Sequence, residues 1–211
     1  MRSALTNRTY WEQMKTTDFH QYLRKSQKRE VIFDFDGTIS TLLINWAEWD
    51  RAVGQVLQGY DPAFVPLGII EAVQQNAFMQ RFGKKLRDDL LHTTYKHEKE
   101  LLSGHQINPV ALALIEMARS VANLHIWTSN HLETIYPILQ ELHLDNAFKR
   151  IIARGDVTFI KPHPEGFYLL FDENNPKSAY LLIGDSKKDE EAAKSAGIDF
   201  LNISSFRDDI G

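Results

Sequence analysis

The stretch Val31-Ile32-Phe33-Asp34-Phe35-Asp36-Gly37-Thr38 decides the fold of this 211-residue chain. It begins with β-branched and aromatic residues, which are typical of a strand buried between two layers of helices. Side chains two positions apart on a strand point the same way, so Asp34 and Asp36 are predicted to face one cleft while Phe35 packs on the opposite side. Ligands of open α/β sheets bind beyond the carboxyl ends of the strands, which makes this a candidate site. Acids at a strand end also form turns and helix caps, so this stretch alone leaves that alternative open.

Strand and helix patterns alternate from residue 108 onward. Asn108 and Pro109 are favourable residues for the cap and the first position of a helix. The alternation predicts an α/β fold with a doubly wound, Rossmann-like parallel sheet and right-handed connections. The predicted strands after the first are 124–127, 150–153, 179–183 and 200–203, and the predicted helices between them are 132–142, 165–171 and 189–196.

A helical pattern fills the space between the first strand and residue 105. Apolar residues recur at helical spacing over 42–57, 69–82 and 84–102, and no strand pattern interrupts them. We therefore predict a small inserted α-helical cap domain over 44–105, and a core domain formed by 30–43 and 106–211. The alternative is that these helices belong to a single domain. Trp46 and Trp49 are interpreted mainly as core of the cap, and the basic residues Arg81, Lys84, Lys85 and Arg87 as its solvated face.

Residues 1–29 lie outside the alternating pattern. Their apolar residues recur at loosely helical spacing before a basic run over 24–29, and they are Tyr10, Trp11, Met14, Phe19, Tyr22 and Leu23. We predict an N-terminal helical extension packed on the core, with a partner-binding arm as the alternative.

The composition narrows the class of protein. The chain contains no cysteine, which excludes disulfides, thiolate metal sites and cysteine nucleophiles. The net charge of −4 predicts no general attraction to nucleic acid or to an anionic membrane. No segment has the roughly 20 apolar residues of a membrane span, and the N-terminus lacks the pattern of a signal peptide. We expect a cytoplasmic protein, and the oligomeric state stays open.

Acidic or hydroxyl residues follow three of the predicted strands. In the sequence, a lysine stands between the second and the third of these sets. If the strands are neighbours, four carboxylates converge, and they cannot all ionise without a cation. Oxygen ligands without cysteine favour Mg²⁺. The alternative is a set of surface acids that never meet. The residues are Asp34 and Asp36, Thr128 and Ser129, Lys161, and Asp185 with Asp189 one helical turn later.

These residues make the sequence similar to the haloacid dehalogenase superfamily, and within it to the phosphoglycolate phosphatase and beta-phosphoglucomutase type. The resemblance covers about residues 30–203 and implies a cap inserted after the first motif. Relatives of that type usually have Leu and a short Asp-Ser stretch where this chain has 39–43, which leaves the substrate open. The four motifs stand here as Asp34–Thr38, Thr128, Lys161-Pro162 and Gly184–Asp189.

The resemblance implies a role for each motif residue. Asp34 would be the nucleophile that becomes an aspartyl phosphate, and Asp36 the general acid and base. Thr128, Ser129 and Lys161 would bind the phosphoryl group, Lys161 also acting in catalysis. The ligands of Mg²⁺ would be Asp34, Asp36 through its backbone carbonyl, Asp185 and Asp189, the last through water or by orienting Lys161.

The implied activity is a Mg²⁺-dependent phosphatase acting on a small phosphorylated metabolite. A sugar-phosphate mutase of the same superfamily is one alternative, and a non-catalytic binding protein that keeps the fold is another. A dehalogenase is disfavoured, because members with that chemistry lack the second acid that Asp36 provides.

Overall fold

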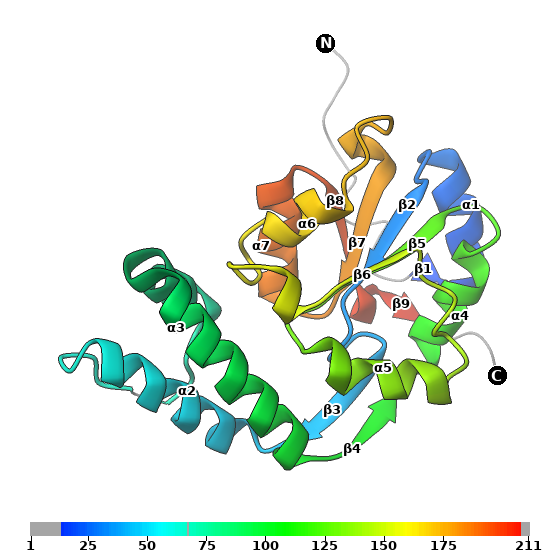
Figure 1. Ribbon diagram of the computed structural model, residues 1–211. Coiled ribbons are helices and arrows are strands. Elements are labelled where there is room, and N and C mark those ends of the chain that lie inside the picture. The colour runs from blue at the N-terminus through cyan, green and yellow to red at the C-terminus, as the bar shows by residue number, and fades with distance from the viewer. Residues whose placement is uncertain (1–13, 67, 208–211) are drawn as a thin grey trace.

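The computed structural model describes residues 14–66 and 68–207. At its centre lies a five-stranded parallel sheet in the order β6-β5-β2-β7-β8, so the strand that carries the two acids is the middle one (Figure 1). The predicted α/β fold with a parallel sheet is confirmed. The strands are β2 (Glu30–Phe33), β5 (Asn123–Trp127), β6 (Arg150–Ile152), β7 (Tyr180–Gly184) and β8 (Asp199–Asn202).

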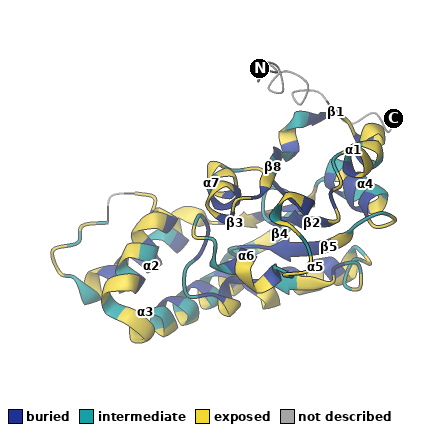
Figure 2. Cartoon of the chain, turned by 90° about the horizontal axis from the view of Figure 1, so that it is seen from above, coloured by how far each residue is buried: buried dark blue, intermediate teal, exposed yellow. Residues whose placement is uncertain are grey.

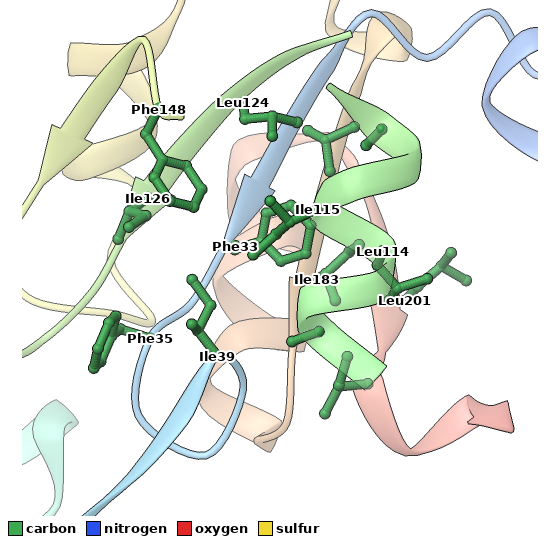
Figure 3. Packing of buried hydrophobic residues seen from close by; sticks show 14 of the residues in the cluster. Phe33, Phe35, Ile39, Leu114, Ile115, Leu124, Ile126, Phe148, Ile183 and Leu201 are labelled. Carbon is green, nitrogen blue, oxygen red and sulfur yellow. The ribbon is translucent and has the colours of Figure 1, made fainter. Parts of the chain in front are cut away.

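Helices cover both faces of the sheet, because alternate residues of each strand are apolar on both sides. Phe33 packs with apolar residues of α4, including Leu114 and Ile115, on one face (Figure 3). Ile32 packs against α6 and α7 on the other face. Truncating a buried phenylalanine such as Phe33 to alanine costs about 3–5 kcal/mol of unfolding free energy. The covering helices are α1 (Phe19–Lys25), α4 (Pro109–Ala118) and α5 (Leu132–Glu141) on the first face, and α6 (Glu165–Leu170) and α7 (Lys187–Ala196) on the second.

Two long helices, α2 (Trp46–Tyr60) and α3 (Ala72–Leu101), form the inserted cap beside the sheet (Figure 1). They bury an apolar stripe against each other and leave their outer surfaces exposed (Figure 2). Gly83 has a φ of 71°, a left-handed value that favours glycine, so α3 is two helical segments joined by a bend. The two predicted helices over 69–82 and 84–102 are therefore confirmed in outline.

The prediction that no strand interrupts this region is wrong at both of its ends. β3 (Ser40–Ile44) and β4 (Leu102–Ile107) pair as a two-stranded antiparallel sheet that joins the cap to the core. Residues of β3 alternate between buried and exposed, which is the period of a strand. Leu42 and Leu43, predicted to begin a helix, therefore point to opposite sides of this ribbon.

The described part of the N-terminal extension packs on the core. Phe19 and Leu23 of α1 are fully buried in the main hydrophobic cluster. The helical prediction is wrong at Met14, because β1 (Met14–Lys15) pairs in parallel with β9 (Phe206–Arg207). Tyr10 and Trp11 lie outside the described residues. The short 3-10 helices are η1 (Thr16–Asp18), η2 (Arg154–Asp156), η3 (Lys177–Ala179) and η4 (Ile203–Ser205).

The helices of the described residues are all too short or too polar to cross a membrane. The longest, α3, is interrupted by charged side chains along its length.

Candidate active site

A cavity of about 420 Å³ lies where the carboxyl ends of the sheet strands meet the cap. Asp34 and Asp36 both line it, while Phe35 between them is buried in the hydrophobic core, as the alternation of β2 predicts. The core also contributes Ser129, Asn130, Arg154, Lys161, Asp185 and Asp189, and the cap contributes Trp46, Trp49, Asp50, Gln75 and Glu98.

Three of the predicted metal ligands form a tight carboxylate cluster. One oxygen from each of Asp34, Asp185 and Asp189 lies within 4.8 Å of the other two. Asp34 and Asp189 are buried and Asp185 is exposed. Hard oxygen donors at this spacing fit a Mg²⁺ ion, which keeps some of its waters. The carboxylate of Asp36 is not part of this cluster of described residues.

Lys161 is the cation that contacts the carboxylate cluster directly. Its Nζ lies 2.7 Å from Oδ1 of Asp34 and 2.5 Å from Oδ1 of Asp189. Burial lowers the pKa of Lys161, but the two carboxylates outweigh burial and hold it above its ordinary value. Burial has the opposite effect on the acid and raises the pKa of Asp189. The ion pair with Lys161 and a hydrogen bond from Ser186 outweigh burial and leave the pKa of Asp189 below its ordinary value. Lys161 and Asp189 are therefore both charged, and each keeps the other in place.

Asp34 experiences a different balance. Burial and the neighbouring Asp189 carboxylate raise the pKa of Asp34 to about 7, although Lys161 opposes them. Two buried carboxylates with one lysine carry a net negative charge, so the cluster favours a further cation. The donor set and its charge thus both suit a divalent metal.

Asp36 lies on the same cavity in a separate environment. Its Oδ1 accepts a 2.7 Å hydrogen bond from the backbone N–H of Leu42 in β3. Burial raises the pKa of Asp36 to about 6. This carboxyl group can therefore exchange a proton near neutral pH, as a general acid and base must.

Gly37 lets Asp185 approach the loop after β2. Its φ is 79°, and a Cβ atom at this position would lie only 2.6 Å from Cγ of Asp185. Any larger residue would push Asp185 away from Asp34, so the glycine is required for the carboxylates to converge.

Thr128 and Ser129 follow β5 at the same edge of the sheet. The Oγ1 of Thr128 is buried, donates to Oδ1 of Asn130 at 2.9 Å and accepts from the backbone N–H of Asn130 at 3.1 Å. Ser129 and Asn130 line the cavity. The structure thus brings Ser129 to the cavity and engages the Thr128 hydroxyl with its own loop.

Several cavity residues are missing from the sequence prediction, and Arg154 and Glu98 are the most buried charged ones. Arg154 lies two positions after the end of β6, so its place just beyond a strand could have indicated a site residue. Glu98 lies inside α3, and its Oε2 accepts from the backbone N–H of His131 at 3.0 Å and from Oγ1 of Thr134 at 2.9 Å. Nothing in a helical stripe indicates such a contact across two elements.

Side chains of the cap hold the loop after β6. The amide of Asn76 donates to the carbonyl of Ile160 at 2.7 Å and accepts from its N–H at 3.0 Å. Arg87 donates to the carbonyls of Gly155 and Val157 at 2.8 and 3.1 Å. The prediction that Arg87 is only a solvated residue is therefore wrong, and the cap contacts the segment that leads to Lys161.

The sequence pattern of the haloacid dehalogenase-like hydrolase family matches residues 31–203, and the chain belongs to this family. The resemblance identified from the motifs is confirmed. A phosphoglycolate phosphatase from Photorhabdus laumondii is 26% identical over 190 residues, which cover 80% of this chain and 77% of that protein. A second one, from Colwellia psychrerythraea, is 27% identical over 197 residues, 85% of this chain and 86% of its own length.

The fold also matches a solved structure. A haloacid dehalogenase-like hydrolase from Bacteroides fragilis superposes with a TM-score of 0.57 at 21% identity, covering 82% of this chain and 86% of that chain.

Proposed function

We propose that the protein is a Mg²⁺-dependent phosphatase that hydrolyses a small phosphate monoester through an aspartyl phosphate on Asp34. The observation that carries the proposal is the position of Asp34, which lines the cavity, belongs to the carboxylate cluster and contacts Lys161 at 2.7 Å. The two curated relatives are named phosphoglycolate phosphatases, which makes a short phosphate monoester the first substrate to test.

Each residue of the site has a proposed role in the reaction. Asp34 attacks phosphorus, and Asp36 gives its proton to the leaving alcohol oxygen and then takes a proton from the water that hydrolyses the intermediate. Lys161 and the backbone N–H of Ser129 hold the phosphoryl oxygens, with Thr128 ordering that loop. Mg²⁺ held by Asp34, Asp185 and the Asp36 carbonyl, with Asp189 in support, would supply positive charge to the transferring group.

The cap has its own part in the proposal. We assign 44–105 to a cap that covers the substrate, 30–43 and 106–211 to the core, and 1–29 to an extension of the core. The support is the cavity, which is lined by residues of both the core and the cap.

Phosphate release measured with and without metal tests the function. The purified protein is incubated with phosphoglycolate, para-nitrophenyl phosphate or a hexose 1-phosphate, in Mg²⁺ or in EDTA. We expect phosphate release that EDTA abolishes and that Asp34→Asn lacks. Isomerisation of the hexose phosphate without phosphate release would indicate the mutase, and inactivity on every ester would support the binding protein.

A further inference from the structure

Arg154 is a buried cation at the end of the cavity lined by the cap. It begins η2, two positions after the end of β6, and is only 7% exposed, yet it lines the cavity. Its Nε donates to the carbonyl of Ser129 at 2.6 Å, and its Nη1 makes a long contact of 3.4 Å with Oε1 of Gln75. These bonds fix the guanidinium beside the loop that we propose to hold the phosphoryl group.

The charge of Arg154 has no direct partner in the described part of the chain. Lys161 is held between two carboxylates, whereas no carboxylate among residues 14–66 and 68–207 forms an ion pair with Arg154. Only two of the five N–H groups of an arginine are used by the contacts above. A desolvated guanidinium with unused donors favours an anion, since an unpaired buried charge is costly.

Trp49 adds a second unused donor. Its indole Nε1 is buried without an acceptor among the described residues, and the side chain lines the same cavity. The guanidinium carbon of Arg154 lies 5.4 Å from the centre of the Trp49 ring. A ligand group that only accepts hydrogen bonds would satisfy both donors.

The acids that line this end of the cavity form no ion pair with Arg154 in the described part of the chain. Glu98 interacts with Arg154 at long range; its Oε2 accepts from His131 and Thr134, and its Oε1 is buried without a partner among the described residues. Asp50 accepts from the backbone N–H of Ile70 at 3.1 Å. They reduce the positive potential without filling the donors of Arg154.

We propose that Arg154, with the indole N–H of Trp49, binds a carboxylate on the alcohol part of the substrate. The inference rests on the proposed phosphatase function and narrows its substrate to a short phosphate monoester that bears a carboxylate. A planar carboxylate matches the fork of a guanidinium. Arg154 is hydrogen-bonded to the carbonyl of Ser129, so the proposed carboxylate and phosphoryl sites are neighbours. A substrate with a long chain between its carboxylate and its phosphate would not fit both sites.

Two matched substrates test this site in the full-length protein with Mg²⁺. Phosphoglycolate and 2-hydroxyethyl phosphate differ only in a carboxylate against a hydroxymethyl group, and kcat/KM is measured for each. We expect wild type to prefer phosphoglycolate, and Arg154→Gln to reduce that preference by about 10- to 100-fold, mainly through KM. Trp49→Phe, which keeps an aromatic ring and removes the N–H, should reduce the preference by about 3- to 10-fold.

The controls separate a binding role from a structural one. Arg87→Gln removes another arginine that holds the same loop and should leave the preference unchanged. Arg154→Lys keeps the charge without the fork, so its preference should lie between those of wild type and Arg154→Gln, and it decides the test if Arg154→Gln fails to fold. Equal loss on both substrates in the Arg154 variants, or no preference in wild type, would overturn the carboxylate site. Failure of the phosphatase proposal is distinct, because wild type would then release phosphate from neither substrate nor from para-nitrophenyl phosphate.

Discussion

The Nζ atom of Lys161 lies 2.7 Å from Oδ1 of Asp34, so a cation is bound directly to the carboxylate that we propose as nucleophile. Lys161 also contacts Asp189 at 2.5 Å, and Asp189 accepts from the hydroxyl of Ser186 at 2.5 Å. This chain of contacts fixes the position of the lysine. Asp34 is thereby oriented by a group that has little freedom of its own.

Replacing Asp34 tests the nucleophile. Asp34→Asn keeps the shape of the side chain but cannot form an aspartyl phosphate, so kcat should fall by at least about 1,000-fold. Phosphate release from para-nitrophenyl phosphate measures this. Asp88→Asn, an exposed acid on α3 paired with Lys84, is the matched control and should keep full activity. Turnover of the Asp34 variant near the wild-type rate would contradict the mechanism.

Asp36 should separate the two half-reactions. In Asp36→Asn, para-nitrophenolate still leaves without a proton from the protein, but no base activates water for the second step. We expect one rapid release of para-nitrophenolate per protein molecule followed by very slow turnover, with the phosphorylated protein visible by mass spectrometry. Steady turnover without an initial burst would assign the base elsewhere.

Metal should stabilise the fold through the carboxylate cluster. At about 100 times its dissociation constant, Mg²⁺ adds about 2.7 kcal/mol to the free energy of unfolding, which corresponds to a rise in Tm of about 5–10 °C. Asp185→Ala should lose most of this rise, whereas Asp88→Ala should keep it. The rise in Tm is measured by differential scanning fluorimetry. A full rise on adding Mg²⁺ to Asp185→Ala would place the metal outside the cluster.

His131 should make stability depend on pH. Burial and the nearby Arg154 lower the pKa of His131 from 6.5 to about 3, so the folded protein keeps this imidazole neutral. Between these two pH values the unfolded chain binds the extra proton, and stability therefore falls as the pH falls, by at most about 1.4 kcal/mol per pH unit.

The variant His131→Gln isolates this contribution. It cannot titrate, and its amide can still reach Thr94, whose hydroxyl lies 2.8 Å from Nε2 of His131. The loss of Tm between pH 7 and pH 5 should be smaller in His131→Gln than in wild type. His92→Gln, which changes an exposed residue of α3, should behave as wild type. An identical loss in the wild type and in His131→Gln would refute the assignment.

Trp46 and Arg81 are both residues of the cap, and the structure places them differently relative to the cavity. Trp46 lines the cavity, whereas Arg81 pairs with Asp61 at 2.6 Å and lies outside its lining. We expect Trp46→Ala to change the ratio of kcat/KM between small and large esters by about 10-fold, and Arg81→Ala to leave it unchanged. A change of similar size in both variants would contradict this division of the cap.

The core was predictable because its periodicities are local. Every strand of the central sheet follows from a short stretch rich in apolar residues, and Asp34, Ser129 and Asp185 follow from their places after those strands. β3 was not predictable, because Leu42 and Leu43 extend an apolar pattern into α2, and strand pairing with β4 depends on residues some sixty positions away. Such pairing becomes favourable only when the cap folds between the two segments.

The cavity residues divide in the same way. Arg154 obeys the rule that chemistry follows a strand end, so it was accessible to prediction. Glu98 was not, because its burial depends on the N-terminus of α5 meeting the C-terminal turn of α3. Tertiary packing, which no local pattern encodes, decides whether such a carboxylate is a solvated helix residue or part of a cavity.

We expect the ribbon of β3 and β4 to couple the position of the cap to the proposed acid-base role of Asp36. β3 and β4 are the two connections between the cap and the core, and they are hydrogen-bonded to each other. We therefore expect them to move as one unit, which would allow the cap to tilt but would resist twisting of the cap about the strand direction. The same two-stranded sheet contains Leu42, whose N–H donates a hydrogen bond to the carboxylate of Asp36. We expect any tilt of the cap to shift that N–H. The carboxyl group of Asp36 would then be aligned for proton transfer only while the cap covers the substrate.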